Sequence, residues 1–139
     1  MRYLGLDLGS KTLGLSISDK TGFLASQYST LRYTDIEVLI KDLLAIMEKE
    51  KIEALVLGYP INLNGTLSDR CRITDEFKVK LEQFTDKKIF LQDERLTTVE
   101  AKRLLIENNT SRSKRKKVID KIAAVLILQA FLDKQGRLS

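Results

Sequence analysis

The stretch YLGLDLGSKTLGLSISDKTGFLASQYSTL, residues 3–31, decides the fold of this chain. Residues 3–8 are almost continuously apolar, and leucine or isoleucine alternates with small residues over 13–17, so both segments are predicted to be β-strands. Short polar segments that contain glycine predict a turn after each of them, and a third strand is expected within residues 23–31. The chain is therefore expected to begin as an antiparallel meander of three strands.

Beyond residue 33 the spacing of the apolar residues predicts helices that alternate with short strands. The first of these elements are a helix that begins in a capping box of Thr34 and Glu37 and a buried strand over 54–57 that ends at Gly58-Tyr59-Pro60. A helix marked by Ile73, Phe77, Leu81 and Phe84 and a strand over 89–91 are expected next. The last two elements are a helix from a second capping box of Thr97 and Glu100 to about Ile106 and, after a basic loop, a helix over 117–134. This order predicts an α/β fold with a mixed five-stranded sheet flanked by helices. Since 139 residues suffice for one core but not for two, we expect a single domain over residues 1–139.

The composition excludes several kinds of site. Cys71 is the only cysteine, so an internal disulfide cannot form, and the absence of histidine removes the usual general base and the usual zinc ligand. No apolar run reaches the roughly 18 residues of a membrane span, and the N-terminus leads into a strand rather than a signal peptide. We therefore expect a cytoplasmic protein without membrane association, in which catalysis would come from carboxylates, hydroxyls and lysines.

The excess of positive charge falls in one segment of the chain, residues 111–121. Its charged residues are Arg112, Lys114, Arg115, Lys116, Lys117 and Lys121, with Asp120 as the only acid. Removing them from the totals of 24 basic and 19 acidic residues leaves 18 of each, so this segment accounts for the whole net charge of +5. Such a patch predicts a polyanion such as nucleic acid as partner, the alternative being a solvated entrance to a helix.

Several acids lie where an ionised carboxylate needs a partner. Asp7 is part of an apolar strand, where burying an unpaired charge is costly. Asp93 and Glu94 directly follow residues 89–91, at the carboxyl end of a strand expected to be central, where ligands collect in parallel sheets. Asp120 is expected in the first turn of the last helix, on a face shared with apolar residues. If these acids converge, they form an oxygen-ligand site for Mg²⁺ or Mn²⁺, and two such ions roughly 4 Å apart could support phosphodiester cleavage.

Each of these acids also has a structural interpretation. Asp7 could accept backbone N–H bonds from the turn that follows it. Asp120 could stabilise a helix N-terminus through the macrodipole, and Glu94 could be an exposed acid paired with Arg95. The metal-site hypothesis therefore depends on the acids being brought together.

Four blocks of sequence carry a more specific resemblance. They are LGLDLGSK at 4–11 with Gly14 and Asp19, GYPIN at 58–62 with Gly65, DERLTT at 93–98, and DKIAA at 120–124. In this order and spacing they resemble the signature blocks of the YqgF (RuvX) family of pre-16S rRNA nucleases and Holliday junction resolvase-like proteins. The resemblance extends over nearly the whole chain, and the last two blocks are its most specific part.

The resemblance implies a ribonuclease H-like fold with an acidic metal site. Asp7, Glu94 and Asp120 match the family's catalytic positions, and Asp93 is expected to be a further metal ligand. The expected cofactor is a pair of Mg²⁺ or Mn²⁺ ions. The expected nucleic-acid-binding residues are Lys11, Arg95, Arg112, Lys114, Arg115 and Lys116, of which Lys11 and Arg95 could instead be counter-ions of the acids.

Two further blocks leave alternatives open. Asn62 and Gly65 either face the substrate or form a plain turn, and Thr97 caps a helix whose N-terminus could face a phosphate. Better characterised junction resolvases carry a strand-end glutamate where this chain has Gly58-Tyr59-Pro60, which leaves Glu94 to supply that ligand.

The function implied is metal-dependent hydrolysis of phosphodiester bonds in the 5′-end processing of pre-16S rRNA during ribosome biogenesis. One alternative is a Holliday junction resolvase that acts on branched DNA, and another is a non-catalytic, nucleic-acid-binding ribosome-assembly factor. An ATP-binding domain of the actin and sugar-kinase type is disfavoured, because those proteins clamp nucleotide between two such domains. The residues choose neither between RNA and DNA nor between a monomer and a homodimer.

Overall fold

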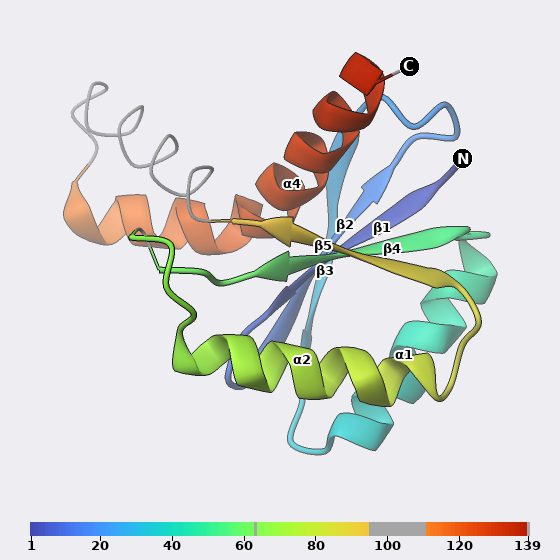
Figure 1. Cartoon of the computed structure of the whole chain (residues 1–139), viewed down its shortest axis with the longest axis horizontal. Coiled ribbons are helices and arrows are strands. Elements are labelled where there is room, and N and C mark those ends of the chain that lie inside the picture. The colour runs from blue at the N-terminus through green and yellow to red at the C-terminus, as the bar shows by residue number, and fades with distance from the viewer. Residues whose placement is uncertain (63, 95–110, 139) are drawn as a thin grey trace.

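The structure, a computed structural model, describes residues 1–62, 64–94 and 111–138 (Figure 1). Its elements are β1 (Tyr3–Leu8), β2 (Thr12–Ser18), β3 (Ala25–Arg32), α1 (Ile36–Lys49), β4 (Ala54–Tyr59), α2 (Asp69–Glu82), β5 (Lys88–Asp93) and α4 (Arg112–Leu138). The five strands form one sheet in the order β3-β2-β1-β4-β5. β2 is antiparallel to both β1 and β3, whereas β1, β4 and β5 are parallel. The predicted α/β fold with a mixed five-stranded sheet flanked by helices is confirmed.

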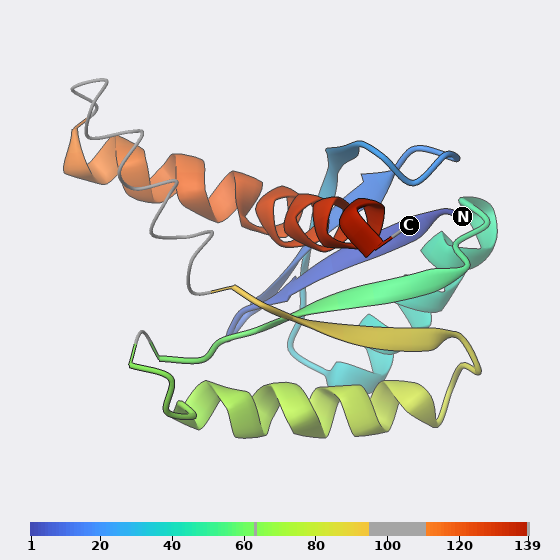
Figure 2. The same ribbon diagram turned by 45° about the horizontal axis from the view of Figure 1, so that its top comes forward.

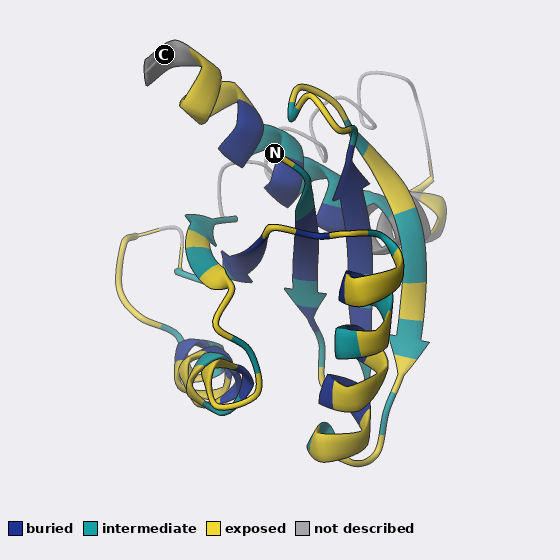
Figure 3. Cartoon of the chain, turned by 90° about the vertical axis from the view of Figure 1, so that its right-hand side faces the viewer, coloured by how far each residue is buried: buried dark blue, intermediate teal, exposed yellow. Residues whose placement is uncertain are grey.

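Helices cover both faces of the sheet and divide the core into two clusters (Figures 1 and 3). On one face, α1 and α2 pack against alternate residues of the strands, among them Leu4, Leu6 and Leu8 of β1. On the other face, Ile127, Leu128 and Phe131 of α4 pack with residues of β1, β4 and β5. Since successive strand residues point to opposite faces, the residues of β1 that alternate with its three leucines lie on the α4 side.

The helix starts differ from the predictions. Asp35 rather than Thr34 is the N-cap of α1, because its carboxylate accepts the Glu37 N–H at 2.8 Å. α4 begins at Arg112, so the basic segment is helical and the expected loop is wrong. This segment contains no glycine or proline, and lysine and arginine are good helix formers. Asp120 therefore lies well inside α4 rather than in its first turn.

Two predicted strands and one helix also need correction. β4 continues through Gly58 and Tyr59, because only Pro60 lacks the N–H that the ladder uses. β5 is an edge strand rather than a central one. The second helix ends before Phe84, and Ile73 lies on its exposed side. Its buried residues are Cys71, Thr74, Phe77 and Leu81. The helix expected from Thr97 to Ile106 lies outside the described residues.

α4 is longer than the sheet that it covers. Its second half packs on the strands, while Figures 1 and 2 show its first half (orange) extending past the carboxyl ends of β4 and β5. Within the described parts of the chain, every helix falls short of the length or the apolarity that a membrane span requires.

Candidate active site

The packing of α4 on the sheet is close enough to fix the position of the helix. Ser16 of β2 donates its hydroxyl hydrogen to the Ala124 carbonyl oxygen at 2.6 Å. A Cβ on Gly5 would lie 2.9 Å from the Cβ of Leu128 and would also collide with the Ser16 hydroxyl. The lack of a side chain at Gly5 and the small side chain of Ala124 therefore allow α4 to lie almost on the sheet backbone.

Asp7 lies beside this close approach. It pairs with Gly14 across β1 and β2, and a Cβ on Gly14 would lie 3.6 Å from the Asp7 Cβ and 3.7 Å from the Ala124 Cβ. Asp7 and Ala124 therefore flank the same glycine on the α4 side of the sheet. Asp120 precedes Ala124 by four residues, which is about one helical turn. The backbone of Asp120 is thus one turn from Ala124, while its side chain lies outside what the structure describes.

Glu94 reaches the same side of the sheet from β5. Its N–H donates to the Tyr59 carbonyl oxygen at 3.3 Å, which continues the parallel pairing of β5 with β4. A Cβ on Gly58 would lie 2.5 Å from Glu94 Oε2 and 2.5 Å from Ile127 Cδ1. The Glu94 carboxylate thus occupies the space that a side chain at residue 58 would fill, between β4 and α4.

The electrostatics show that Glu94 shares its environment with other acids. The pKa of the Glu94 carboxyl is raised to about 7, chiefly by burial and then by the charges of Asp7 and Asp93, with Arg70 opposing the rise. Strongly shifted carboxyls of this kind cluster at functional sites. We refer to Asp7, Asp93 and Glu94 as the acid cluster.

The acid cluster lies at the carboxyl ends of parallel strands, the edge where ligands collect in open sheets. Asp7 is near the end of β1 and Asp93 is the last residue of β5. Within the described residues, no three aspartate, glutamate or cysteine side chains are close enough to hold one metal ion between them. Any metal site at this edge would therefore need a ligand beyond the described side chains.

Arg70 is a residue of this site that the sequence analysis missed. Its guanidinium Nη2 donates to the Leu8 carbonyl oxygen at 2.6 Å, at the residue after Asp7. It lies on α2 at the spacing i, i+4, i+7, i+11 with the buried residues Thr74, Phe77 and Leu81. A basic residue on the apolar side of a helix needs a partner, so the position of Arg70 in the apolar pattern of α2 could have identified it from the sequence.

The basic residues expected to bind nucleic acid are only partly described. Lys11 is exposed in the turn between β1 and β2, and Lys114 is exposed on α4. Arg112, Arg115 and Lys116 belong to the first turns of α4, but their side chains lie outside the described residues, as does all of Arg95.

Three of the motif residues have a structural role. The Asp19 carboxylate accepts the N–H groups of Phe23 and Leu24 at 2.9 and 3.2 Å, and so closes the turn before β3. Asn62 is bonded within its own turn, because the Gly65 N–H donates to the Asn62 carbonyl oxygen and the Asn62 amide donates to the Thr66 hydroxyl. Gly65 has a φ of +87°, which favours glycine at that point of the turn.

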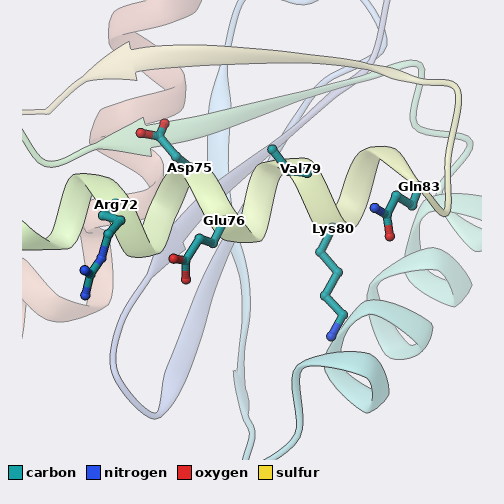
Figure 4. A pocket seen from close by; sticks show the side chains of 6 residues that line it. All are labelled: Arg72, Asp75, Glu76, Val79, Lys80 and Gln83. Atoms are coloured by element: carbon teal, nitrogen blue, oxygen red, sulfur yellow. The ribbon is translucent and has the colours of Figure 1, made fainter.

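A surface hollow of about 390 Å³ lies apart from the acid cluster, along α2 (Figure 4). Its lining residues are Arg72, Asp75, Glu76, Val79, Lys80 and Gln83. None of them belongs to the acid cluster, so this hollow is not the candidate active site.

Comparison with known proteins assigns the family. A family model described as Holliday junction resolvase, RuvX, matches residues 1–134. The chain belongs to the RuvX family. RuvX relatives from Clostridium botulinum (strain Alaska E43 / Type E3) and Bacillus subtilis (strain 168) are both named "Putative pre-16S rRNA nuclease". Each is 44% identical to this chain and covers 96% of it and 98% of its own length.

Solved structures support the fold of this RuvX chain. Thermus thermophilus RuvC in complex with a Holliday junction substrate superposes with a TM-score of 0.59 at 13% identity, over 98% of this chain and 96% of RuvC. Fowlpox virus resolvase with Holliday junction DNA gives 0.52 at 10% identity, over 97% of this chain and 99% of the resolvase. At these identities the likeness shows the fold alone, and the ribonuclease H-like fold is confirmed.

Proposed function

We propose that this chain is a divalent-metal-dependent nuclease that hydrolyses phosphodiester bonds in precursor 16S rRNA, in the cytoplasm. The observation that carries the proposal is the Glu94 carboxyl beside Asp7, at the carboxyl edge of the sheet and with its pKa raised to about 7. Relatives that align along 96% of the chain are named for action on this RNA. A buried acid beside other acids, in a chain without histidine, supports metal-dependent rather than imidazole-dependent hydrolysis.

The donor set fits a hard divalent cation. Carboxylate oxygens are the ligands that Mg²⁺ and Mn²⁺ prefer, and Asp7, Glu94 and Asp120 would hold the metal. Asp93 directly precedes Glu94 in the chain and, by strand alternation, belongs to the opposite face, so we assign it a supporting role. When bound, one or two such ions would activate water and stabilise the leaving oxygen.

The fold gives these acids their function by holding them in place. Asp7 is paired with Gly14 of β2, and Leu6 directly before it is also paired with Leu57 of β4, so the sheet holds the Asp7 backbone in place. Glu94 is confined between Gly58 and Ile127, which removes part of its hydration. A carboxylate that is poorly hydrated and close to other acids binds a cation more favourably than one in water, because the cation relieves both penalties.

The basic half of α4 is suited to hold the nucleic-acid backbone. Arg112 to Lys116 precede Asp120 by four to eight residues, which corresponds to roughly 6–12 Å along a helix. Lysine and arginine side chains at that distance would contact phosphates a few nucleotides from the cleaved bond. Lys11 and Arg95 are the candidates for contacts nearer to it.

One assay tests the proposal and its main rival. Purified protein would be incubated with 5′-extended precursor 16S rRNA, an unrelated single-stranded RNA and a four-way DNA junction, each with Mg²⁺, Mn²⁺ or a chelator. We expect metal-dependent cleavage of the precursor RNA. Preferential cutting of the junction would favour a resolvase, the function in the family model's description. Binding without cleavage would favour an assembly factor, and cleavage undiminished in chelator would refute the metal dependence.

A further inference from the structure

Arg70 bonds to one of the two strands that carry the acids and acts electrostatically on the acid that follows the other. Its guanidinium bonds to the Leu8 carbonyl oxygen at the end of β1, and its charge lowers the pKa of Glu94, which follows β5. β4 lies between these two strands. Arg70 therefore reaches from α2 to the edge of the sheet where the acid cluster lies, although it is 62 residues from Leu8 in the chain.

The bond to Leu8 uses only part of what an arginine can donate. A guanidinium carries five N–H donors in a fixed fork, and the Leu8 carbonyl takes one of them. Among the described residues, Arg70 forms no ion pair with a carboxylate within 4.0 Å. The side chain is also only half-buried, so solvent or a ligand can reach it.

Holding the end of β1 does not require the remaining N–H donors of Arg70. Tyr33 already donates its hydroxyl hydrogen to the next carbonyl, that of Gly9. The positive charge of Arg70 instead acts on the Glu94 carboxyl, which in the proposed function binds metal and so becomes neutralised. A phosphodiester beside that metal presents two non-bridging oxygens, which match the planar fork of an arginine.

We infer that Arg70 is a substrate-contacting residue that binds a non-bridging phosphate oxygen next to the acid cluster while its other arm holds the Leu8 carbonyl. The inference rests on the proposed nuclease function. An arginine suits this position better than a lysine, because a single ammonium group cannot reach a carbonyl and a phosphate in two directions at once.

Arg72 provides a matched control. It has the same side chain on the same helix two residues later, and it is exposed in the hollow along the outer side of α2 (Figure 4). Neutralising Arg72 removes the same net charge from the protein without touching the edge of the sheet. An effect specific to Arg70 therefore cannot come from net charge alone.

The test is equilibrium binding of precursor rRNA to wild type, Arg70→Gln, Arg70→Lys and Arg72→Gln over a range of salt. Ca²⁺ replaces Mg²⁺, and the RNA is checked for integrity afterwards. We expect Arg70→Gln to weaken binding on the order of tenfold, as for removal of one charged hydrogen bond. Its slope of log affinity against log salt should fall by about 0.7, which corresponds to one single-strand phosphate. Arg72→Gln should match wild type in affinity.

The conservative variant keeps the inference testable if Arg70→Gln does not fold. Arg70→Lys retains the charge but carries its donors on a single nitrogen, so it should unfold at nearly the wild-type temperature and still lose several-fold in affinity. Wild-type affinity of Arg70→Gln would overturn the inference and leave Arg70 a purely structural residue. If Arg70→Gln is unfolded, wild-type affinity of Arg70→Lys would have the same consequence. A wild-type protein that neither binds nor cleaves the RNA would instead refute the proposed function, and the inference with it.

Discussion

The Glu94 carboxylate lies where a side chain on Gly58 would have to be, 2.5 Å from the position of a Cβ on that residue. Gly58 is therefore a steric requirement of the site as well as part of β4. Gly58 carries no acid itself, but the carboxylate of Glu94, which follows the neighbouring strand β5, lies over it.

We expect Gly58→Ala to impair the enzyme without changing any charged group. The new methyl group would displace both Glu94 and Ile127, at a cost of about 1–3 kcal/mol in the free energy of unfolding. Cleavage should fall at least tenfold, because Glu94 would no longer be held beside Asp7. Gly14→Ala is the control, since its Cβ would meet neighbours at ordinary distances of 3.6–3.8 Å. Equal activities of the two variants would contradict this explanation of Gly58.

The raised pKa of Glu94 has a consequence for stability against pH. Its pKa is 4.5 in the unfolded chain and about 7 in the folded protein, so the folded state binds this proton more tightly. The stability that comes from the protonated carboxyl is fully present below about pH 4.5 and is lost as the pH rises through about 7.

Glu94→Gln isolates this effect from the other titrating groups. Without metal, the variant should match wild type near pH 4.5 and be more stable at about pH 8. The difference should be on the order of 1–3 kcal/mol after allowance for solvent screening. Urea denaturation of both proteins in chelator at the two pH values measures it. A stability difference that is the same under the acidic and the alkaline condition would show that Glu94 is not buried among charges.

The basic half of α4 should dominate non-specific affinity for nucleic acid. Replacing Arg112, Lys114, Arg115 and Lys116 with alanine should leave the helix intact, because alanine is the best helix former. Binding should weaken, and the slope of log affinity against log salt should flatten by about 0.7–0.9 for each phosphate that the protein no longer neutralises. Replacing the exposed residues Lys20, Lys41, Lys49 and Lys87 removes the same charge elsewhere and serves as the control. If both sets have the same effect, the segment acts only through net charge.

The sequence was most informative where a pattern is local. Alternation along residues 13–17 predicts β2 because the period of a strand is a property of consecutive residues. The choice between Thr34 and Asp35 as helix cap was beyond such reasoning, since both residue types cap well and the geometry of the preceding turn decides.

Long-range relationships were less accessible to the sequence. Nothing in the apolar run at 89–91 shows that β5 is an edge strand, because the order of strands depends on the connections between them. Arg70 was missed because its partner, the Leu8 carbonyl, is 62 residues away and is a backbone group without any sequence signature. The motif blocks compensated for part of this, since two of them contain Asp7 and Glu94, which the folded sheet brings within electrostatic reach of one another.

The most direct test of the metal-dependent mechanism is the substitution Asp7→Asn, with thermal unfolding measured in chelator beside cleavage of precursor rRNA in Mg²⁺. The variant nearly preserves the shape of the side chain and removes one negative charge from the acid cluster, so the metal-free protein should keep or slightly gain stability. Cleavage should fall by orders of magnitude, because the metal would lose a charged ligand. A stable variant with near-normal cleavage would contradict the catalytic assignment. A markedly destabilised one would show that Asp7 serves mainly to hold the turn after β1.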